Sequence, residues 1–223
     1  MRMNYKSILL FSLVSVCFSV NAQMRTKEIY HYILPEFAKG SVLMKDGTKN
    51  SALLNYNAAT EEMIFDQKGE KLAFAELTLN QLDTVFIQDR KFILLDKKKF
   101  AEVIHQDGYK LLVQYKCRVI PPGKPAPFGG TSQTSSATTY SSWIGDGQIY
   151  QLDLPDDFKV NSSVIYWLDN GEGLKSFSSM GQLKKFYNKQ KSLYNKYTKE
   201  NKVDFKDTEA IAALIHYMET NSQ

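Results

Sequence analysis

The largest group of side chains that could do chemistry is a set of lysines near the C-terminus. Between residues 175 and 206, nine lysines are accompanied by only two acidic residues, Glu200 and Asp204. Ammonium groups gathered in this way can bind anions such as an acidic polysaccharide or lipid head groups, although a lysine-rich helix face also serves simply to keep a protein soluble. The candidate anion-binding residues are Lys184, Lys185, Lys189, Lys191, Lys196 and Lys199.

A second chemistry would need a pair of carboxylates. Asp146, Asp153 and Asp156 could supply the acid and the base of a glycan- or peptide-directed hydrolase, which requires two carboxyl groups about 5 to 10 Å apart in a groove. A calcium site at Asp153, Asp156 and Asp157 is less favoured than a turn at a strand end, because the loop glycine and the full set of ligands are missing. The hydrolase stays open as an alternative function.

The remaining reactive residue types are isolated in the sequence. The three histidines, His31, His105 and His216, are far apart, and no two have the spacing of metal ligands. Each is expected to lie on a strand face or a helix face. The sequence also lacks a Gly-x-Ser-x-Gly nucleophile motif, a His-Glu-x-x-His zinc motif and a phosphate-binding Gly-Lys-Ser/Thr motif. We therefore predict no catalytic residue, no metal site and no cofactor.

The first residues of the chain predict export. Arg2 and Lys6 precede an apolar run over residues 8–20, and Ala22 provides the small residue that a signal peptidase needs. The run of 13 residues is too short to cross a bilayer as a helix. We expect a cleavable signal peptide over residues 1–22, a mature chain without a transmembrane segment, and a periplasmic or extracellular location.

Export would change the cysteine count and the charge balance. Cleavage would remove Cys17, at which lipid modification is the less favoured alternative because Val16 is bulky. Cys117 would then be the only thiol, and its alternating sequence context predicts a small buried hydrophobe in a strand. Two of the 28 lysines and arginines lie in residues 1–22, so 26 would remain against 24 acidic residues. An anionic partner would have to recognise a local cluster, and export makes nucleic acid an unexpected partner.

The elements that carry these residues begin with a predicted hairpin. Apolar residues flank Asp46-Gly47 between Gly40 and Asn57, and this dipeptide supplies the positive φ values of a tight reversal. One face of the hairpin is expected in the core, through Val42, Met44, Leu54 and Tyr56.

Short segments bounded by turn residues continue this pattern and predict an antiparallel β-meander or barrel-like sheet over residues 23–178. A stretch rich in proline, glycine, serine and threonine at 121–142 is expected to form a flexible loop. The further strands are predicted at residues 29–33, 63–65, 71–74, 84–87, 91–95, 101–105, 109–119, 148–154 and 163–168.

Residues 179–223 change to a helical period. Ser179 and Gln182 have the spacing of a capping box, and Asp207 can cap a last helix. That helix should bury one stripe, formed by Ile211, Leu214, Ile215 and Met218. We predict a C-terminal module of two or three short helices docked on the sheet, and an α+β fold overall.

Three stretches of the sequence carry a resemblance. Residues 40–47 with 52–57, the Ser/Thr-rich loop before 147–150, and residues 202–205 before the last helix resemble an uncharacterised group of exported Bacteroides-type proteins of unknown function. The resemblance implies export into a Gram-negative envelope and a single α+β unit, and it provides no activity or catalytic residue. We expect a non-catalytic envelope protein that acts as a binding or structural component, with an envelope protein or an anionic glycan or lipid as its partner.

Overall fold

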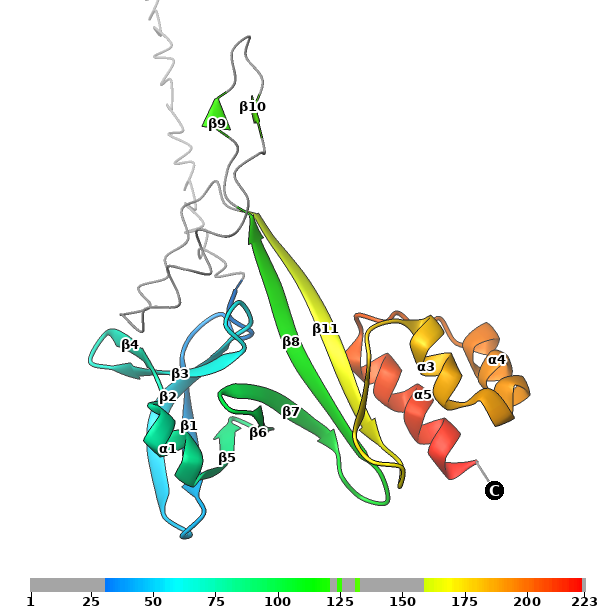
Figure 1. Cartoon of the computed structure of the whole chain (residues 1–223), viewed down its shortest axis with the longest axis horizontal. Helices are drawn as coiled ribbons and strands as arrows, with labels where there is room; N and C mark the ends of the chain where they lie inside the picture. The colour runs from blue at the N-terminus through cyan, green and yellow to red at the C-terminus, as the bar shows by residue number, and fades with distance from the viewer. Residues whose placement is uncertain (1–30, 121–123, 126–130, 133–158, 222–223) are drawn as a thin grey trace, which may run out of the picture.

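One antiparallel sheet of ten strands runs through the part of the chain that the computed structural model describes, namely residues 31–120, 124–125, 131–132 and 159–221. The sheet joins a lobe that consists of β1 to β7, called the β lobe below, to a group of helices (Figure 1). The predicted α+β fold with an antiparallel meander is confirmed. The strands are β1 (Ala38–Met44), β2 (Lys49–Asn57), β3 (Glu62–Gln67), β4 (Glu70–Ala73), β5 (Leu82–Ile87), β6 (Arg90–Asp96), β7 (Lys99–His105), β8 (Lys110–Ile120), β11 (Lys159–Asp169) and β12 (Lys175–Phe177).

The order of the strands follows from two meanders that meet at β1. Strands β1 to β4 pair in chain order, and the short helix α1 (Glu76–Gln81) then returns the chain so that β5 pairs with the other side of β1. From β5 the pairing again follows the chain through β6 and β7 to β8. The long strand β11 pairs with β8 from Lys159, opposite Ile120, to Asp169, opposite Lys110, and β12 forms the sheet edge.

The predicted hairpin around Asp46-Gly47 is confirmed as β1 and β2. Gly47 has a φ of 88°, and the Asp46 carboxylate accepts a hydrogen bond from the backbone N of Thr48 at 2.8 Å. A Cβ at Gly40 would lie 2.4 Å from the carbonyl oxygen of Phe86 in β5, so glycine is required where these strands approach closely. The predicted core face is also confirmed, because Val42, Leu54 and Tyr56 are buried and Met44 packs against them.

The turn between β2 and β3 closes the β lobe into a barrel-like shape. Strands β7 and β8 diverge, and this turn fills the space between them: the backbone N of Phe100 in β7 donates to the carbonyl oxygen of Glu61 at 3.0 Å, and that of Cys117 in β8 donates to Ala58 at 2.8 Å. The buried Tyr56 hydroxyl lies 3.2 Å from a carbonyl oxygen of β7 and 2.8 Å from one of β8. The hydrophobic core of the lobe lies behind this closure.

The helices at the C-terminal end begin where the sequence predicts. Ser179 Oγ accepts from the backbone N of Gln182 at 3.3 Å, and Asp207 Oδ1 accepts from the backbone N atoms of Glu209 and Ala210 at 3.0 and 3.1 Å. The helical module, as we call it, consists of α3 (Met180–Phe186), the 3-10 turn η1 (Asn188–Gln190), α4 (Lys191–Glu200) and α5 (Thr208–Thr220).

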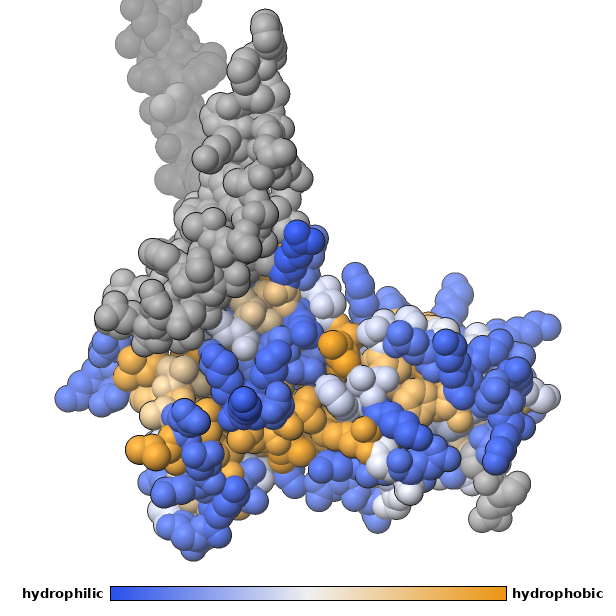
Figure 2. All heavy atoms as spheres, viewed as in Figure 1, coloured by the Kyte–Doolittle hydropathy of each residue, from blue (hydrophilic) through white to orange (hydrophobic). Residues whose placement is uncertain are grey.

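This module shares a second hydrophobic core with β8, β11 and β12. All four residues of the predicted α5 stripe are fully buried. They pack with strand residues, among them Leu111, Val113, Tyr166, Leu168 and Phe177. Hydrophilic side chains cover much of the outer surface of the module in Figure 2, whereas apolar side chains continue over the part of the sheet between the module and the β lobe. None of the described helices is long and apolar enough to cross a membrane.

Several predicted elements differ or lie outside the described residues. Of the strand expected at 29–33, the described part shows only a bridge between Tyr32 and Asn57. Helix α1 and strand β12 were not predicted, because six and three residues are too few to establish a period. Within the expected loop at 121–142, Lys124–Pro125 (β9) pairs with Thr131–Ser132 (β10). The signal peptide, the strand at 148–154 and the three candidate hydrolase aspartates lie outside the described residues.

Candidate anion-binding site

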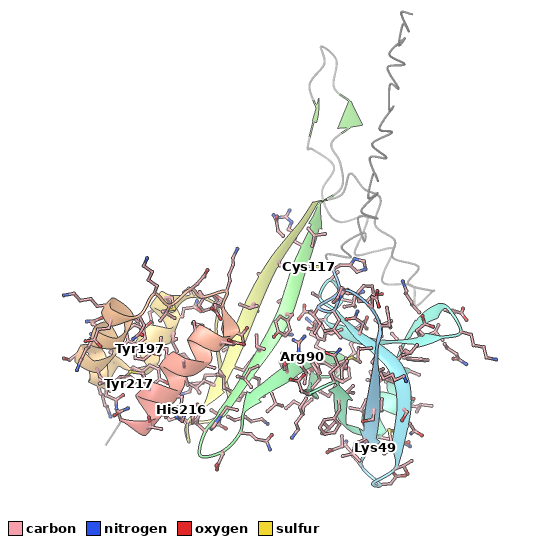
Figure 3. The ribbon with its side chains drawn as sticks, turned by 180° about the vertical axis from the view of Figure 1, so that it is seen from behind. Lys49, Arg90, Cys117, Tyr197, His216 and Tyr217 are labelled. Carbon is pink, nitrogen blue, oxygen red and sulfur yellow. The ribbon has the colours of Figure 1, made fainter. Side chains whose placement is uncertain are left out.

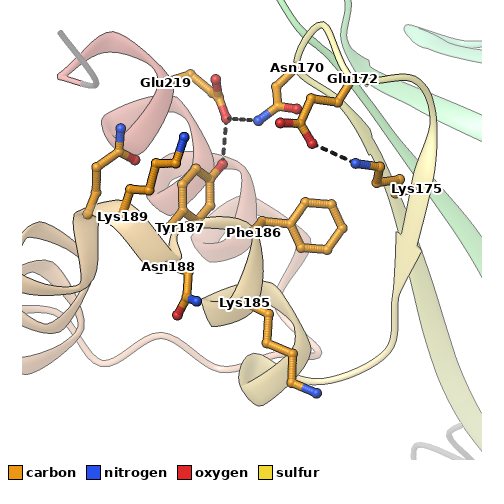
Figure 4. Close-up of a pocket in the computed structure, with 10 residues that line it drawn as sticks. Asn170, Glu172, Lys175, Lys185, Phe186, Tyr187, Asn188, Lys189 and Glu219 are labelled. Atoms are coloured by element: carbon orange, nitrogen blue, oxygen red, sulfur yellow. Dashed lines mark hydrogen bonds and ion pairs between the residues drawn. The ribbon is translucent and has the colours of Figure 1, made fainter.

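A hollow of about 480 Å³ lies where the turn after β11 meets the helical module (Figure 4). We call it the first pocket. Its walls come from three parts of the chain: the turn with the start of β12, the end of α3 with η1, and the last turns of α5. The residues that line it are Asn170, Glu172, Lys175, Lys185, Phe186, Tyr187, Asn188, Lys189, Gln190 and Glu219.

Local sequence explains why these segments converge. Asp169 Oδ1 accepts hydrogen bonds from the backbone N atoms of Gly171 and Gly173, both at 3.0 Å, and both glycines have positive φ. This turn brings Lys175 back beside the helices. On the other side, α3 ends at Phe186, and the 3-10 turn η1 begins at Asn188. The chain changes direction there, so that Lys189 follows Lys185 along the pocket wall.

Glu219 and Tyr187 form the fixed part of the first pocket. Tyr187 is 3% exposed, and its hydroxyl donates to Glu219 Oε1 at 2.7 Å. Asn170 Nδ2 approaches the same oxygen at 3.5 Å. Burial, together with this bond, raises the pKa of Tyr187 far above its usual range, so the phenol keeps its proton. None of the described residues donates to the second carboxylate oxygen of Glu219, which therefore remains able to accept a hydrogen bond from a ligand hydroxyl.

The three lysines of the pocket differ in their partners. Lys175 Nζ binds Glu172 Oε2 at 2.6 Å, and this bond lowers the pKa of the exposed Glu172 carboxyl. Lys185 and Lys189 have no carboxylate within ion-pair distance among the described residues. In Figure 4 the Lys189 side chain points toward the side where Glu219 lies, whereas Lys185 points away from it. The ammonium groups of Lys185 and Lys189 are thus both available to an anion, and they point in different directions.

The other predicted lysines lie elsewhere on the module. Lys184 is half-buried on α3, and three exposed lysines lie on α4 outside the pocket, namely Lys191, Lys196 and Lys199. The structure therefore brings together two of the six candidates and adds Lys175, which the set of six did not include. The signal that could have found Lys175 is its position directly after the glycine turn at 169–173.

The structure confirms the expected strand and helix positions of two histidines, with His105 on β7 and His216 on α5, whereas His31 lies in a turn. His105 stacks on Tyr109 with ring centroids 4.0 Å apart, and the His105 and His216 rings are 6.1 Å apart, so two histidines that are distant in sequence meet in space. Figure 3 shows His216 on α5, beside the β7–β8 turn. Within the described ranges no three His, Cys, Asp or Glu side chains are placed to hold a metal ion. Burial raises the pKa of the half-buried Cys117 thiol to about 12, as suits a packing role.

A charged cluster at the junction of the two cores was not predicted. Arg90 Nε and Nη2 donate to the two carboxylate oxygens of Glu102 at 2.8 and 2.7 Å, and the Tyr115 hydroxyl donates to Glu102 Oε2 at 2.6 Å. Tyr115 packs against both hydrophobic cores, and Figure 3 shows Arg90 between the β lobe and the β8–β11 ribbon. We call these three residues the junction cluster. All of its charged groups are paired.

A second saturated cluster lies at the barrel closure. The Glu61 carboxylate accepts a short hydrogen bond from Gln114 and forms ion pairs with Lys99 at 3.3 Å and Lys116 at 3.0 Å. Trp167 Nε1 lies 3.3 Å from Gln114 Oε1 and completes the network. These charges hold the closing turn in place and leave no ionic group free for a ligand.

Comparison with protein-family models, with curated proteins and with solved structures finds no match to this chain. The functional conclusion therefore depends on the geometry of the first pocket and on the sequence.

Proposed function

We propose that this protein is a non-catalytic binding component of a Gram-negative cell envelope, and that its helical module binds an anionic polysaccharide in the first pocket. The observation that carries the proposal is the pair of lysines, Lys185 and Lys189, that have no carboxylate partner among the described residues and line a pocket whose other polar groups suit sugar hydroxyls. The predicted signal peptide at residues 1–22 supports export, and the resemblance to exported Bacteroides-type proteins supports a location in a Gram-negative envelope.

Binding is favoured over catalysis because the carboxylates and the phenol of the pocket are held in fixed pairs. Tyr187 donates to Glu219, and Lys175 is bound to Glu172. A phenol whose pKa is raised by burial does not act as a base near neutral pH. The remaining ammonium groups of Lys185 and Lys189 can attract an anion and need no further chemistry for that purpose.

A polysaccharide is favoured over a lipid because of what lines the pocket. Asn170, Asn188 and Gln190 offer amide donors and acceptors, and Glu219 offers a carboxylate oxygen. Phe186 is the one purely apolar side chain in the lining. An acyl chain would contact little apolar surface here. The hydroxyls of a sugar ring can bind the polar groups of the lining, and its apolar face can pack on Phe186.

The test is a titration of the full mature chain with polygalacturonate, with neutral dextran as the control polymer. We expect binding to polygalacturonate only, with an affinity that falls as salt is added. The double variant Lys185→Gln/Lys189→Gln should weaken binding about tenfold or more, because two charge-assisted contacts are lost.

The matched control is Lys196→Gln/Lys199→Gln, which removes the same charge from a part of α4 outside the pocket. This variant should bind within about twofold of the parent. Equal weakening by both double variants would show that diffuse surface charge, not the pocket, binds the polymer. Binding to phosphatidylglycerol vesicles without binding to polygalacturonate would overturn the polysaccharide proposal in favour of a lipid.

A further inference from the structure

A second hollow adjoins the first pocket along β12. It has a volume of about 360 Å³, and we call it the second pocket. Its lining includes Ile165, Ser176, Phe177, Ser178 and Gln182. The Gln182 amide oxygen accepts from Ser178, which leaves the amide NH2 group free to donate to a ligand.

Lys185 and Phe186 line both pockets and form the wall between them. Phe186 is half-buried and packs edge-on against the buried Phe177, with ring centroids 5.6 Å apart and an interplanar angle of 66°. This contact fixes the Phe186 ring while part of its surface stays exposed. The two hollows therefore share the Phe186 ring and the Lys185 side chain, and a ligand that extends from one hollow into the other would contact that ring.

We infer that the two pockets are adjoining subsites of one groove, and that the groove binds a chain of at least two linked acidic sugars; this inference rests on the proposed function. Phe186 supports the apolar face of a sugar ring at the junction of the subsites. Lys189 serves the carboxylate of a sugar in the first pocket, and Lys185 serves the neighbouring sugar.

The chemistry along the groove supports a sugar chain in particular. Lys185 lines both pockets and Lys189 lines the first, and neither has a carboxylate partner among the described residues. Amide or hydroxyl groups accompany them, from Asn170 and Gln190 in the first pocket and from Ser176 and Gln182 in the second. Polar groups thus line both pockets, and the half-buried Phe186 ring lies between them. A linked acidic sugar repeats the same combination of one carboxylate, several hydroxyls and an apolar face with every unit.

The experiment measures the affinity of the full mature chain for galacturonate oligomers of one to four units by calorimetry. We expect the affinity to rise about tenfold between the monomer and the dimer or trimer and then to level off, because a second subsite adds one lysine contact and the aromatic contact. Ser176→Tyr, which fills the second pocket, should remove this gain, so that the dimer and the trimer bind no more tightly than the monomer. Ser192→Tyr, on an exposed position of α4 outside both pockets, is the control.

A second variant, Phe186→Leu, keeps an apolar contact with Phe177 and should reduce the affinity for the dimer by about fivefold, with an unchanged circular-dichroism melting curve as proof of folding. An affinity that does not rise with oligomer length, or a Ser176→Tyr variant that keeps the gain, would overturn the two-subsite groove alone. Absence of binding to every oligomer and to polygalacturonate would overturn the proposed function as well.

Discussion

The junction cluster and the first pocket both contain charged side chains, but their cations are in different states. In the junction cluster, Glu102 is 7% exposed and is bound by both Arg90 and Tyr115. In the first pocket, Lys185 and Lys189 are exposed and have no carboxylate partner in the described part of the chain. The difference shows that pairing and burial, more than residue type, decide whether a charged group stabilises the fold or remains available to a ligand.

The physical reason for the difference is desolvation. A buried charge that loses its partner costs several kcal/mol, so the junction cluster keeps its groups engaged with one another. An exposed ammonium group keeps its water and needs no partner, so the pocket can present two of them at little cost to stability. Substitutions in the junction cluster should therefore change mainly the free energy of unfolding, and substitutions of the pocket lysines should change mainly the affinity for a ligand.

Glu102→Ala should have the largest effect on stability. It leaves the Arg90 guanidinium and the Tyr115 hydroxyl without their acceptor at the junction of two cores. We expect the free energy of unfolding in urea to fall by about 2 to 3 kcal/mol, somewhat less than for a fully enclosed pair because Arg90 is partly exposed. Glu70→Ala, at an exposed position of the edge strand β4, should change it little. An equal loss in both variants would contradict the role of the junction cluster.

Tyr187→Phe should change the dependence of stability on alkaline pH. Burial raises the pKa of Tyr187 in the folded state above the unfolded value of about 10. The folded chain then holds a proton that the unfolded chain loses, so this contribution is complete below pH 10 and is lost as pH rises further. Between pH 10 and 11 the variant should lose about 1 kcal/mol less unfolding free energy than the parent. Parallel curves for the two proteins would contradict this prediction.

Glu61→Gln should loosen the barrel closure. It removes the ion pairs with Lys99 and Lys116, and the backbone N of Cys117 is bonded to the same turn. A loss of about 1 kcal/mol in local stability would raise the rate of Cys117 labelling by a disulfide reagent about fivefold, since local opening of the turn exposes the half-buried thiol. Lys189→Gln, in the pocket, should leave the labelling rate unchanged. A parental rate in Glu61→Gln would show that the ion pairs do not hold the turn.

The sequence predicts features that depend on neighbouring residues better than features that depend on long-range pairing. The hairpin at Asp46-Gly47 and the caps Ser179 and Asp207 depend on neighbouring residues, and the structure confirms all three. The junction cluster depends on the pairing of β6, β7 and β8, so the contact between Arg90 and Glu102 has no local signal.

The sequence could predict only part of the first pocket, because some of its features are local and others depend on long-range contacts. The lysine-rich composition of residues 175–206 marks the right part of the chain, but the choice between Lys189 and Lys196 depends on where α3 ends and η1 begins. The convergence of Glu219 from α5 with the turn at Asn170 is a long-range contact. The contact between His105 and His216 beside Tyr109 could not be predicted from the sequence either, because it also joins residues far apart in the chain.

Glu172→Gln should have the smallest effect on stability and sharpens the comparison most directly. Glu172 is exposed, and its bond to Lys175 is a surface ion pair within one short turn, so the free energy of unfolding should not change measurably. The substitution removes a negative charge from the first pocket and frees the Lys175 ammonium group. Binding of a galacturonate dimer should become about threefold tighter at low salt, and the gain should disappear at high salt because exposed charges are screened. A variant that is destabilised without any gain in affinity would place Glu172 with Glu102 among the groups that hold the fold, and the first pocket would no longer differ from the junction cluster.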